Sequence, residues 1–243
     1  VAPAPLAQRL PSVGDRWARF GSAASDGSTA PASAPADAKT PDDEEAPNLH
    51  AATHADRPAA FRRFVAAIEP TDAPTLHFLH SALPHHPWIH DERGERYADD
   101  DTTAGLVGSR WSDDPVLADL GLQRHMLQVG LVDRLLGELV AHLRATGLYE
   151  RCLLVVTSDH GSAFTPRRHK RRPSPETLTD VMYVPLFVKR PGQTRGERID
   201  ASAETVDVVP TIADLLGVAL PGRVDGHSLA GAAPERAEKV LDF

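Results

Sequence analysis

A leucine-rich helical pattern followed by a short apolar run constrains this chain most. The pattern predicts one long helix over about residues 115–146, whose buried face carries leucines at every fourth position: Leu127, Leu131, Leu135, Leu139 and Leu143. Gly147 is suited to end this helix, because glycine readily adopts the left-handed conformation that follows many helices. The apolar run 153–156 comes next and is typical of a buried parallel strand.

Other segments repeat this alternation of helix and strand. Apolar spacing predicts helices within residues 55–70 and 204–217, and residues 75–80 and 184–190 have the composition of strands. Residues 84–114 are expected to form an ordered loop. Strands that alternate with helices predict an α/β fold with a mainly parallel sheet.

The N-terminal part has a different composition. Residues 1–20 include Trp17 and Phe20 and are expected to be a docking segment on a domain surface. Residues 21–56 are rich in Ala, Ser, Pro and Asp, with few bulky apolar side chains, so we predict a disordered insertion. Residues 57–243 then form the C-terminal part of the domain. The chain begins with Val1, so we expect it to belong to a longer protein.

Charge and cysteine content exclude some functions. The formal net charge of −8 argues against non-specific binding of nucleic acid, which requires a basic face. Cys152 is the single cysteine, so neither an internal disulfide nor a cysteine-based zinc site is possible. No apolar run is long enough for a membrane helix, and we expect any membrane signal of the parent protein to lie outside this chain.

Asp159 and His160 carry the most specific chemistry in the sequence. They follow the apolar run 153–156, and functional groups of open α/β sheets collect at the carboxyl ends of strands. A turn eased by Gly161 can aim both side chains at one point. A carboxylate and an imidazole together suit Mn²⁺, Zn²⁺ or Mg²⁺. The alternative is a strand-end pair that only caps a turn.

Four segments, in this order, resemble the sulfatase and alkaline-phosphatase-like superfamily: LPHHPW (83–88), the helix and strand that lead into SDHG (158–161), VPLFVKRPG (184–192), and TVDVVPTIADLLG with the trailing DGHSL (225–229). The chain is most similar to the sulfatase-like extracytoplasmic domains of actinobacterial membrane proteins, in which LPHHPW and a QRHMLQVGLVDRLLG-like segment recur.

The resemblance implies a three-layer α/β/α fold and a set of site residues. Asp159 and His160 would ligate a divalent metal ion (Mn²⁺, Mg²⁺, Ca²⁺ or Zn²⁺), and His85 would act on the oxygens of a sulfate or phosphate ester. Substrate contacts would come from the basic run 167–172, through Arg168, His169 and Lys170. The alternatives to these functional roles are structural: His85 would cap the end of a strand, and the basic run would be a solvated loop. The parent would lie on the extracytoplasmic face of a bacterial membrane.

The family's nucleophile is not found in this sequence. There is no Cys/Ser-x-Pro-x-Arg motif, from which sulfatases make formylglycine, and no acidic pair after an early apolar strand. The resemblance therefore implies that the N-terminal half of the domain lies elsewhere, and that this chain alone is inactive.

Three hypotheses follow from the sequence. The first is a hydrolase or transferase that acts on sulfate or phosphate esters. The second is a non-catalytic sulfatase-like module that binds a partner in a membrane assembly. The third, based on the twelve histidines, is a metal-binding protein unrelated to sulfatases.

Overall fold

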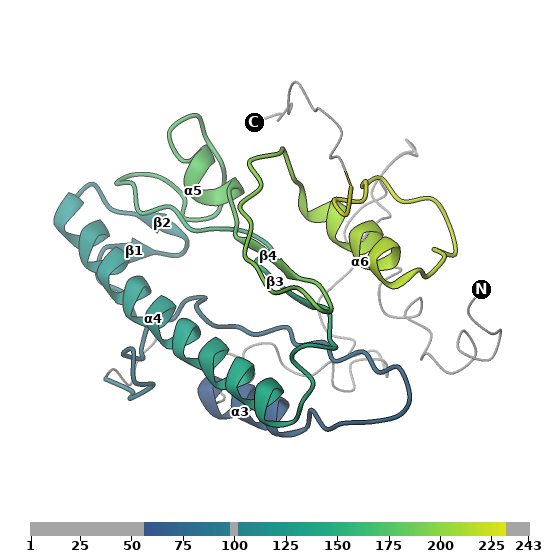
Figure 1. Ribbon diagram of the computed structural model, residues 1–243. Coiled ribbons are helices and arrows are strands. Elements are labelled where there is room, and N and C mark those ends of the chain that lie inside the picture. Colours follow the sequence, from purple (N-terminus) through teal and green to yellow (C-terminus); the bar gives the residue numbers. More distant parts are fainter. Residues whose placement is uncertain (1–55, 98–101, 232–243) are drawn as a thin grey trace, which may run out of the picture.

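The structure is a computed structural model that describes residues 56–97 and 102–231 (Figure 1). The predicted docking segment 1–20 and residues 21–55 of the predicted insertion lie outside the described residues. In chain order the elements are α3 (Arg57–Ala66), β1 (Leu106–Val107), β2 (Arg110–Trp111), α4 (Pro115–Ala145), β3 (Leu154–Thr157), α5 (Leu178–Met182), β4 (Leu186–Lys189), the 3-10 turn η1 (Thr205–Asp207) and α6 (Val208–Leu216).

The long helix α4 confirms the prediction from leucine spacing. The Asp114 carboxylate caps its first turn by accepting a hydrogen bond from the backbone N–H of Val116 (2.9 Å). Gly147 follows the last turn with a φ of 71°. The buried leucines are Leu131, Leu135, Leu139 and Leu143, whereas Leu127 is partly exposed.

Helix α3 packs against α4 and forms the main apolar core with it. Asp56 caps α3 through the backbone N–H of Ala59, and the helix ends at Ala66, a little before the expected end. Its buried side chains join the α4 leucines in one cluster, which also contains Phe61, Val65, Ile68 and Leu83. The core therefore lies between two helices, with Leu154 of β3 packed against it.

The expected parallel sheet is not what the described residues form. β3 and β4 pair antiparallel, with Leu154 opposite Lys189 and Thr157 opposite Leu186. β1 and β2 also pair antiparallel, as a short hairpin within the loop predicted over 84–114. An apolar run does not encode the direction of its neighbour. Here residues 158–185, which include α5, reverse the chain so that β4 runs back along β3, and the two strands lie between α4 and α6 (Figure 1).

The strand predicted over residues 75–80 is wrong. This segment is irregular, and the side chains of Leu76 and Phe78 are 78% and 75% exposed. A strand needs a neighbour that completes its hydrogen-bond ladder, and in the described part of the chain no strand lies alongside this segment.

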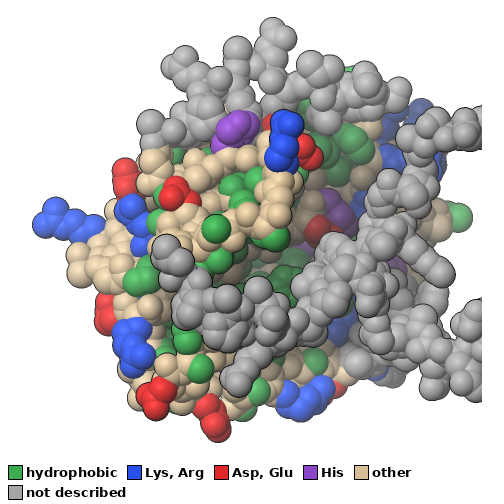
Figure 2. Space-filling view, turned by 90° about the vertical axis from the view of Figure 1, so that its right-hand side faces the viewer, with side chains coloured by type: hydrophobic (Ala, Val, Ile, Leu, Met, Phe, Trp, Pro, Cys, Tyr) green, Lys and Arg blue, Asp and Glu red, His purple; other side chains and the backbone are tan. Residues whose placement is uncertain are grey.

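The helix predicted within 204–217 is confirmed as η1 and α6, and Gly217 ends it with a φ of 64°. The buried Asp207 carboxylate accepts hydrogen bonds from the backbone N–H groups of Glu204 and His227, both 2.8 Å, which ties the 225–229 segment to the helix. On the face shown in Figure 2, hydrophobic side chains lie among charged ones of both signs. Over the described ranges, we find no helix with the length and apolar character that crossing a membrane requires.

Candidate active site

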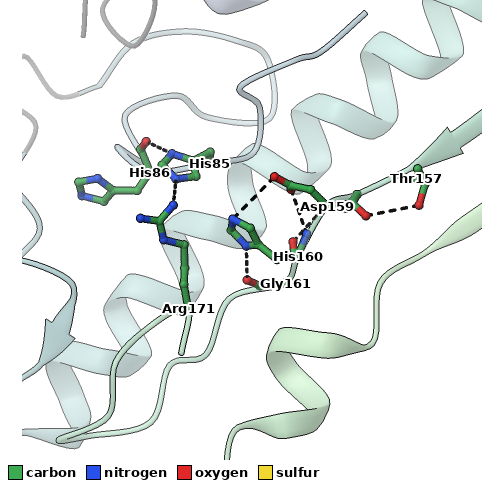
Figure 3. Close-up of polar contacts among 8 residues, drawn as sticks. His85, His86, Thr157, Asp159, His160, Gly161 and Arg171 are labelled. Carbon is green, nitrogen blue, oxygen red and sulfur yellow. Dashed lines mark hydrogen bonds and ion pairs between the residues drawn. The ribbon is translucent and has the colours of Figure 1, made fainter. Parts of the chain in front are cut away.

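The segment after β3 turns so that Asp159 and His160 face one another (Figure 3). The Asp159 carboxylate accepts a hydrogen bond from the backbone N–H of His160 (2.9 Å), and the Ser158 hydroxyl donates to the carbonyl of His160 (2.8 Å). These local bonds leave Nε2 of His160 3.9 Å from Oδ2 of Asp159. The structure therefore brings the predicted pair together at the end of a strand.

Hydrogen bonding fixes which nitrogen of His160 carries the proton in its neutral form. Nδ1 lies 2.8 Å from the carbonyl oxygen of Gly161, so Nδ1–H is the donor. The lone pair of Nε2 is then free to face the Asp159 carboxylate. The separation is too long for a hydrogen bond, and a metal ion placed between these two acceptors could be bound by both.

This pair fits a divalent ion as part of a ligand set. Zn²⁺ commonly takes about four ligands and Ca²⁺ about six to eight, so two donors are too few for either. Within residues 56–97 and 102–231 there is no group of three or more His, Cys, Asp and Glu side chains that could hold a metal ion. Asp159 and His160 can thus supply two ligands, and further ligands must come from other groups.

Gly161 lets the turn approach α5 closely. Its backbone N–H donates to the carbonyl of Val181 (2.8 Å), and a Cβ atom at this position would lie 2.0 Å from the carbonyl oxygen of Asp180. Only glycine fits this approach without a backbone shift.

His85 lies on the other side of His160. The two rings meet edge to face, with centroids 6.4 Å apart and an interplanar angle of 72°. Nδ1 of His85 donates to the carbonyl of His86 (2.5 Å), so Nε2 carries the lone pair, and Nη1 of Arg171 lies 3.4 Å from it (Figure 3). Three segments distant in sequence therefore converge: the LPHHPW turn, the Asp159 turn and the basic loop.

The environment of His85 favours its neutral form. Although part of His85 remains exposed to solvent, partial desolvation by nearby protein atoms is the main cause that lowers the pKa of His85, and the positive charges of Lys170, Arg171 and Arg57 lower it further. The hydrogen bond to the His86 carbonyl acts in the opposite sense and is outweighed. A neutral imidazole beside several cations can accept a proton at Nε2, and only the protonated ring can donate a hydrogen bond from Nε2 to an anionic ligand.

Two of the three predicted substrate-contacting residues, Arg168 and His169, have partners within or near their own loop. Arg168 pairs with Glu176 (2.6 Å). His169 uses Nδ1 to accept the backbone N–H groups of Arg171 and Arg172, both 3.1 Å, which closes its own loop. These contacts give both side chains a role in shaping the loop.

Lys170 is the third predicted substrate-contacting residue. It is 5% exposed, and its charge acts on His85. Its ammonium lies 5.7 Å from the centroid of a Trp88 ring. Burial, with a smaller contribution from the Arg171 charge, lowers the pKa of Lys170 to about 8. It remains mostly charged below that pH and adds positive potential near His85.

Arg171 and Arg57 are part of this site, and the sequence pattern did not single out either of them. Arg171 belongs to the basic run 167–172, which was visible, but composition does not tell which side chain of a loop turns inward. Arg57 is buried at the start of α3, and its guanidinium donates to the carbonyl of His85 (2.8 Å). The spacing of apolar residues does not predict that a charged residue at the start of a helix is buried.

A hollow of about 430 Å³ adjoins the Gly161 turn. Apolar side chains dominate its lining, and α4 supplies one wall. The residues that line it are Leu122, His125, Met126, Gly161, Ser162, Phe164, Thr165 and Asp180.

Residues 25–218 match the sulfatase family. The chain is 31% identical to arylsulfatase K of Bos taurus over 111 residues, which cover 46% of this chain and 20% of the relative. It is 36% identical to arylsulfatase K of Danio rerio over 97 residues (40% and 18%). It is 34% identical over 100 residues to the multifunctional alkaline phosphatase superfamily protein PehA of Trinickia caryophylli (40% and 19%).

Among solved structures, the phosphonate monoester hydrolase of Silicibacter pomeroyi is similar, with 34% identity and a TM-score of 0.40 over 45% of this chain and 21% of that chain. The matches span about a fifth of the length of these curated relatives. The family match, by contrast, covers most of the 243 residues. This chain belongs to the sulfatase family of the alkaline phosphatase superfamily, and its fold is of the alkaline-phosphatase-like type.

Proposed function

We propose that this chain supplies part of the active site of a metal-dependent hydrolase or transferase that acts on sulfate or phosphate esters. The observation that carries the proposal is the convergence of Asp159, His160 and His85 beside the cations of the basic loop. Membership of the sulfatase family supports an ester substrate. The third hypothesis, a metal-binding protein unrelated to sulfatases, conflicts with the family match.

Each residue has a role that follows from its contacts. Asp159 and His160 would hold a divalent ion (Mn²⁺, Mg²⁺, Ca²⁺ or Zn²⁺) together with ligands from other groups. Such an ion supplies charge neutralisation at sulfuryl or phosphoryl oxygens. Arg171 and Lys170 add fixed positive charge beside His85, where an ester anion would be stabilised. His85 would accept a proton at Nε2, and the protonated ring would then donate a hydrogen bond, or the proton itself, from Nε2 to the ester oxygens.

The finer assignments rest on the sequence resemblance. LPHHPW and the QRHMLQVGLVDRLLG segment support a place among sulfatase-like extracytoplasmic domains of actinobacterial membrane proteins. On this proposal the full-length protein acts at the outer face of a membrane. Residues that precede the described part in the full-length protein would complete the metal site and supply the nucleophile.

The proposal is tested by turnover in the full-length protein. Aryl sulfate and phosphodiester substrates are assayed with Mn²⁺ for the wild type, for Asp159→Ala, and for Asp113→Ala as the control. Asp113 is an exposed acidic residue paired with Arg167, so its loss removes a carboxylate without touching the site. We expect Asp159→Ala to lose turnover and the control to retain it. Equal turnover in wild type and Asp159→Ala contradicts the proposal.

A non-catalytic module is the alternative, and it is favoured by the small ligand set. The described residues offer Asp159 and His160 and no larger cluster of metal-ligating side chains. The same assay separates the two functions. Wild-type protein that turns over neither ester class with Mn²⁺ or Zn²⁺ supports the module, in which the sulfatase-like body binds a partner in a membrane assembly.

A further inference from the structure

Gln128 is a buried polar side chain whose amide bonds to both ends of the turn that carries His85. It lies on α4 and is 0% exposed. Its Oε1 accepts the backbone N–H groups of Ile89 (3.1 Å) and His90 (3.3 Å). Its Nε2 donates to the carbonyls of Pro84 and His85, both 3.3 Å. One side chain thus bonds to backbone groups at the start of the turn (Pro84 and His85) and at its end (Ile89 and His90).

The position of Gln128 makes it an effective anchor. α4 is a helix of 31 residues held in the core by four buried leucines, so its backbone is a rigid reference for the turn. The amide is fully used, and buried amides are stable only when their hydrogen bonds are made. Four backbone hydrogen bonds of Gln128 consequently fix the turn relative to α4, and Nδ1 of His90 also lies 3.3 Å from Oε1 of Gln128.

Arg57 braces the same turn from α3. Its guanidinium donates to the carbonyls of His85 (2.8 Å) and His86 (3.4 Å). The His85 carbonyl therefore receives hydrogen bonds from two different helices. With its backbone held in this way, the His85 ring projects towards His160 and Arg171 (Figure 3).

We propose that Gln128 is a positioning residue, which holds the 84–90 turn so that the His85 imidazole faces His160 and Arg171. The importance of this for turnover rests on the proposed function, whereas the geometry itself does not. Gln128 bonds to backbone groups of the turn and acts on the ester through His85. Loss of the anchor should lower kcat more than it changes KM, because Lys170 and Arg171 remain to bind the anion.

The test compares Gln128→Met with wild type and with Leu139→Met in the full-length protein. Methionine fills nearly the same volume as glutamine and makes none of the four bonds. Leu139 is buried on the same helix, about three turns beyond Gln128, so its replacement controls for a core change in α4. We expect Gln128→Met to lower kcat at least about tenfold with KM within about twofold, because small misplacements of a reacting group are costly.

A second readout does not need turnover. The nuclear Overhauser contact between the rings of His85 and His160 should weaken in Gln128→Met and persist in Leu139→Met. If Gln128→Met fails to fold, Gln128→Glu replaces it, because a carboxyl group can accept from Ile89 and His90 but can donate to at most one of the two carbonyls. The same losses are expected.

The outcomes separate the two claims. A wild-type ring contact in the Gln128 variant overturns the positioning role, and so does wild-type kcat. A raised KM with an unchanged kcat also overturns the positioning role. An inactive wild type contradicts the proposed function, and in that case the ring contact alone decides whether Gln128 sets the direction of His85.

Discussion

Nη1 of Arg171 lies 3.4 Å from Nε2 of His85, although the two residues are 86 positions apart in the sequence. This contact joins the basic loop to the LPHHPW turn, and both face the Asp159–His160 pair at the end of β3 (Figure 3). Because His85 donates its Nδ1 proton to the His86 carbonyl, Nε2 is left as an acceptor for the guanidinium. The arginine thereby acts on the protonation of the histidine.

Replacing Arg171 with methionine should raise the pKa of His85. Partial desolvation would still keep that pKa below the ordinary value of 6.5, but one of the neighbouring cations that lower it would be gone. The titration of His85 is measured by NMR in both proteins. Arg172→Met is the matched control, since the Arg172 charge affects His169 and is not among the causes that shift His85. An equal shift in both variants contradicts the account.

The free energy of unfolding should fall as the pH is lowered through 6.5. Burial lowers the pKa of His125, whose ring contacts the rings of Trp88 (centroids 5.7 Å apart) and Phe164 (5.3 Å). The unfolded chain then binds a proton at a higher pH than the folded chain, so stability present above about pH 6.5 is lost between that pH and the lowered pKa.

Urea denaturation at pH 7.5 and 5.5 measures this loss. His125→Phe removes one titrating group and should give a smaller loss than the wild type. His80→Ala, at an exposed position outside the core, is the control substitution. A pH dependence unchanged by His125→Phe is the contrary result.

Alanine at Gly161 should destabilise the protein by about 1–3 kcal/mol, because the new Cβ would overlap the Asp180 carbonyl and force the backbone to move. Gly137→Ala is the control. Gly137 lies in the interior of α4 with no atom within 4 Å of an added Cβ, so alanine there should stabilise the helix by up to about 1 kcal/mol. Thermal or urea denaturation gives both values, and a neutral Gly161→Ala refutes the close approach.

The helices were predictable because their signals are local. The leucine spacing of α4, its Asp114 cap and its Gly147 stop are all contained in one stretch of sequence. The strand over 75–80 failed for the opposite reason, since alternating side chains do not show whether a partner strand is present. The direction of the β3–β4 pairing depends on the path of residues 158–185, which no short pattern encodes.

The candidate site was predictable only in part. The end of an apolar run indicated where Asp159 and His160 would lie, and the LPHHPW motif indicated His85. Whether Arg168, Lys170 or Arg171 turns inward depends on the hydrogen bonds that His169 makes within the loop. Gln128 was hidden because a polar residue on a helix is usually assigned to the solvated face.

The central claim is that Asp159 and His160 share a cation. Calorimetric titration of the metal-free full-length protein with Mn²⁺ tests it most directly, with His160→Ala compared against His80→Ala. The account predicts that His160→Ala weakens Mn²⁺ binding by at least about tenfold and that His80→Ala leaves it unchanged, since loss of a ligand or its support costs about 10–100-fold in affinity. Wild-type affinity and stoichiometry in His160→Ala would contradict it.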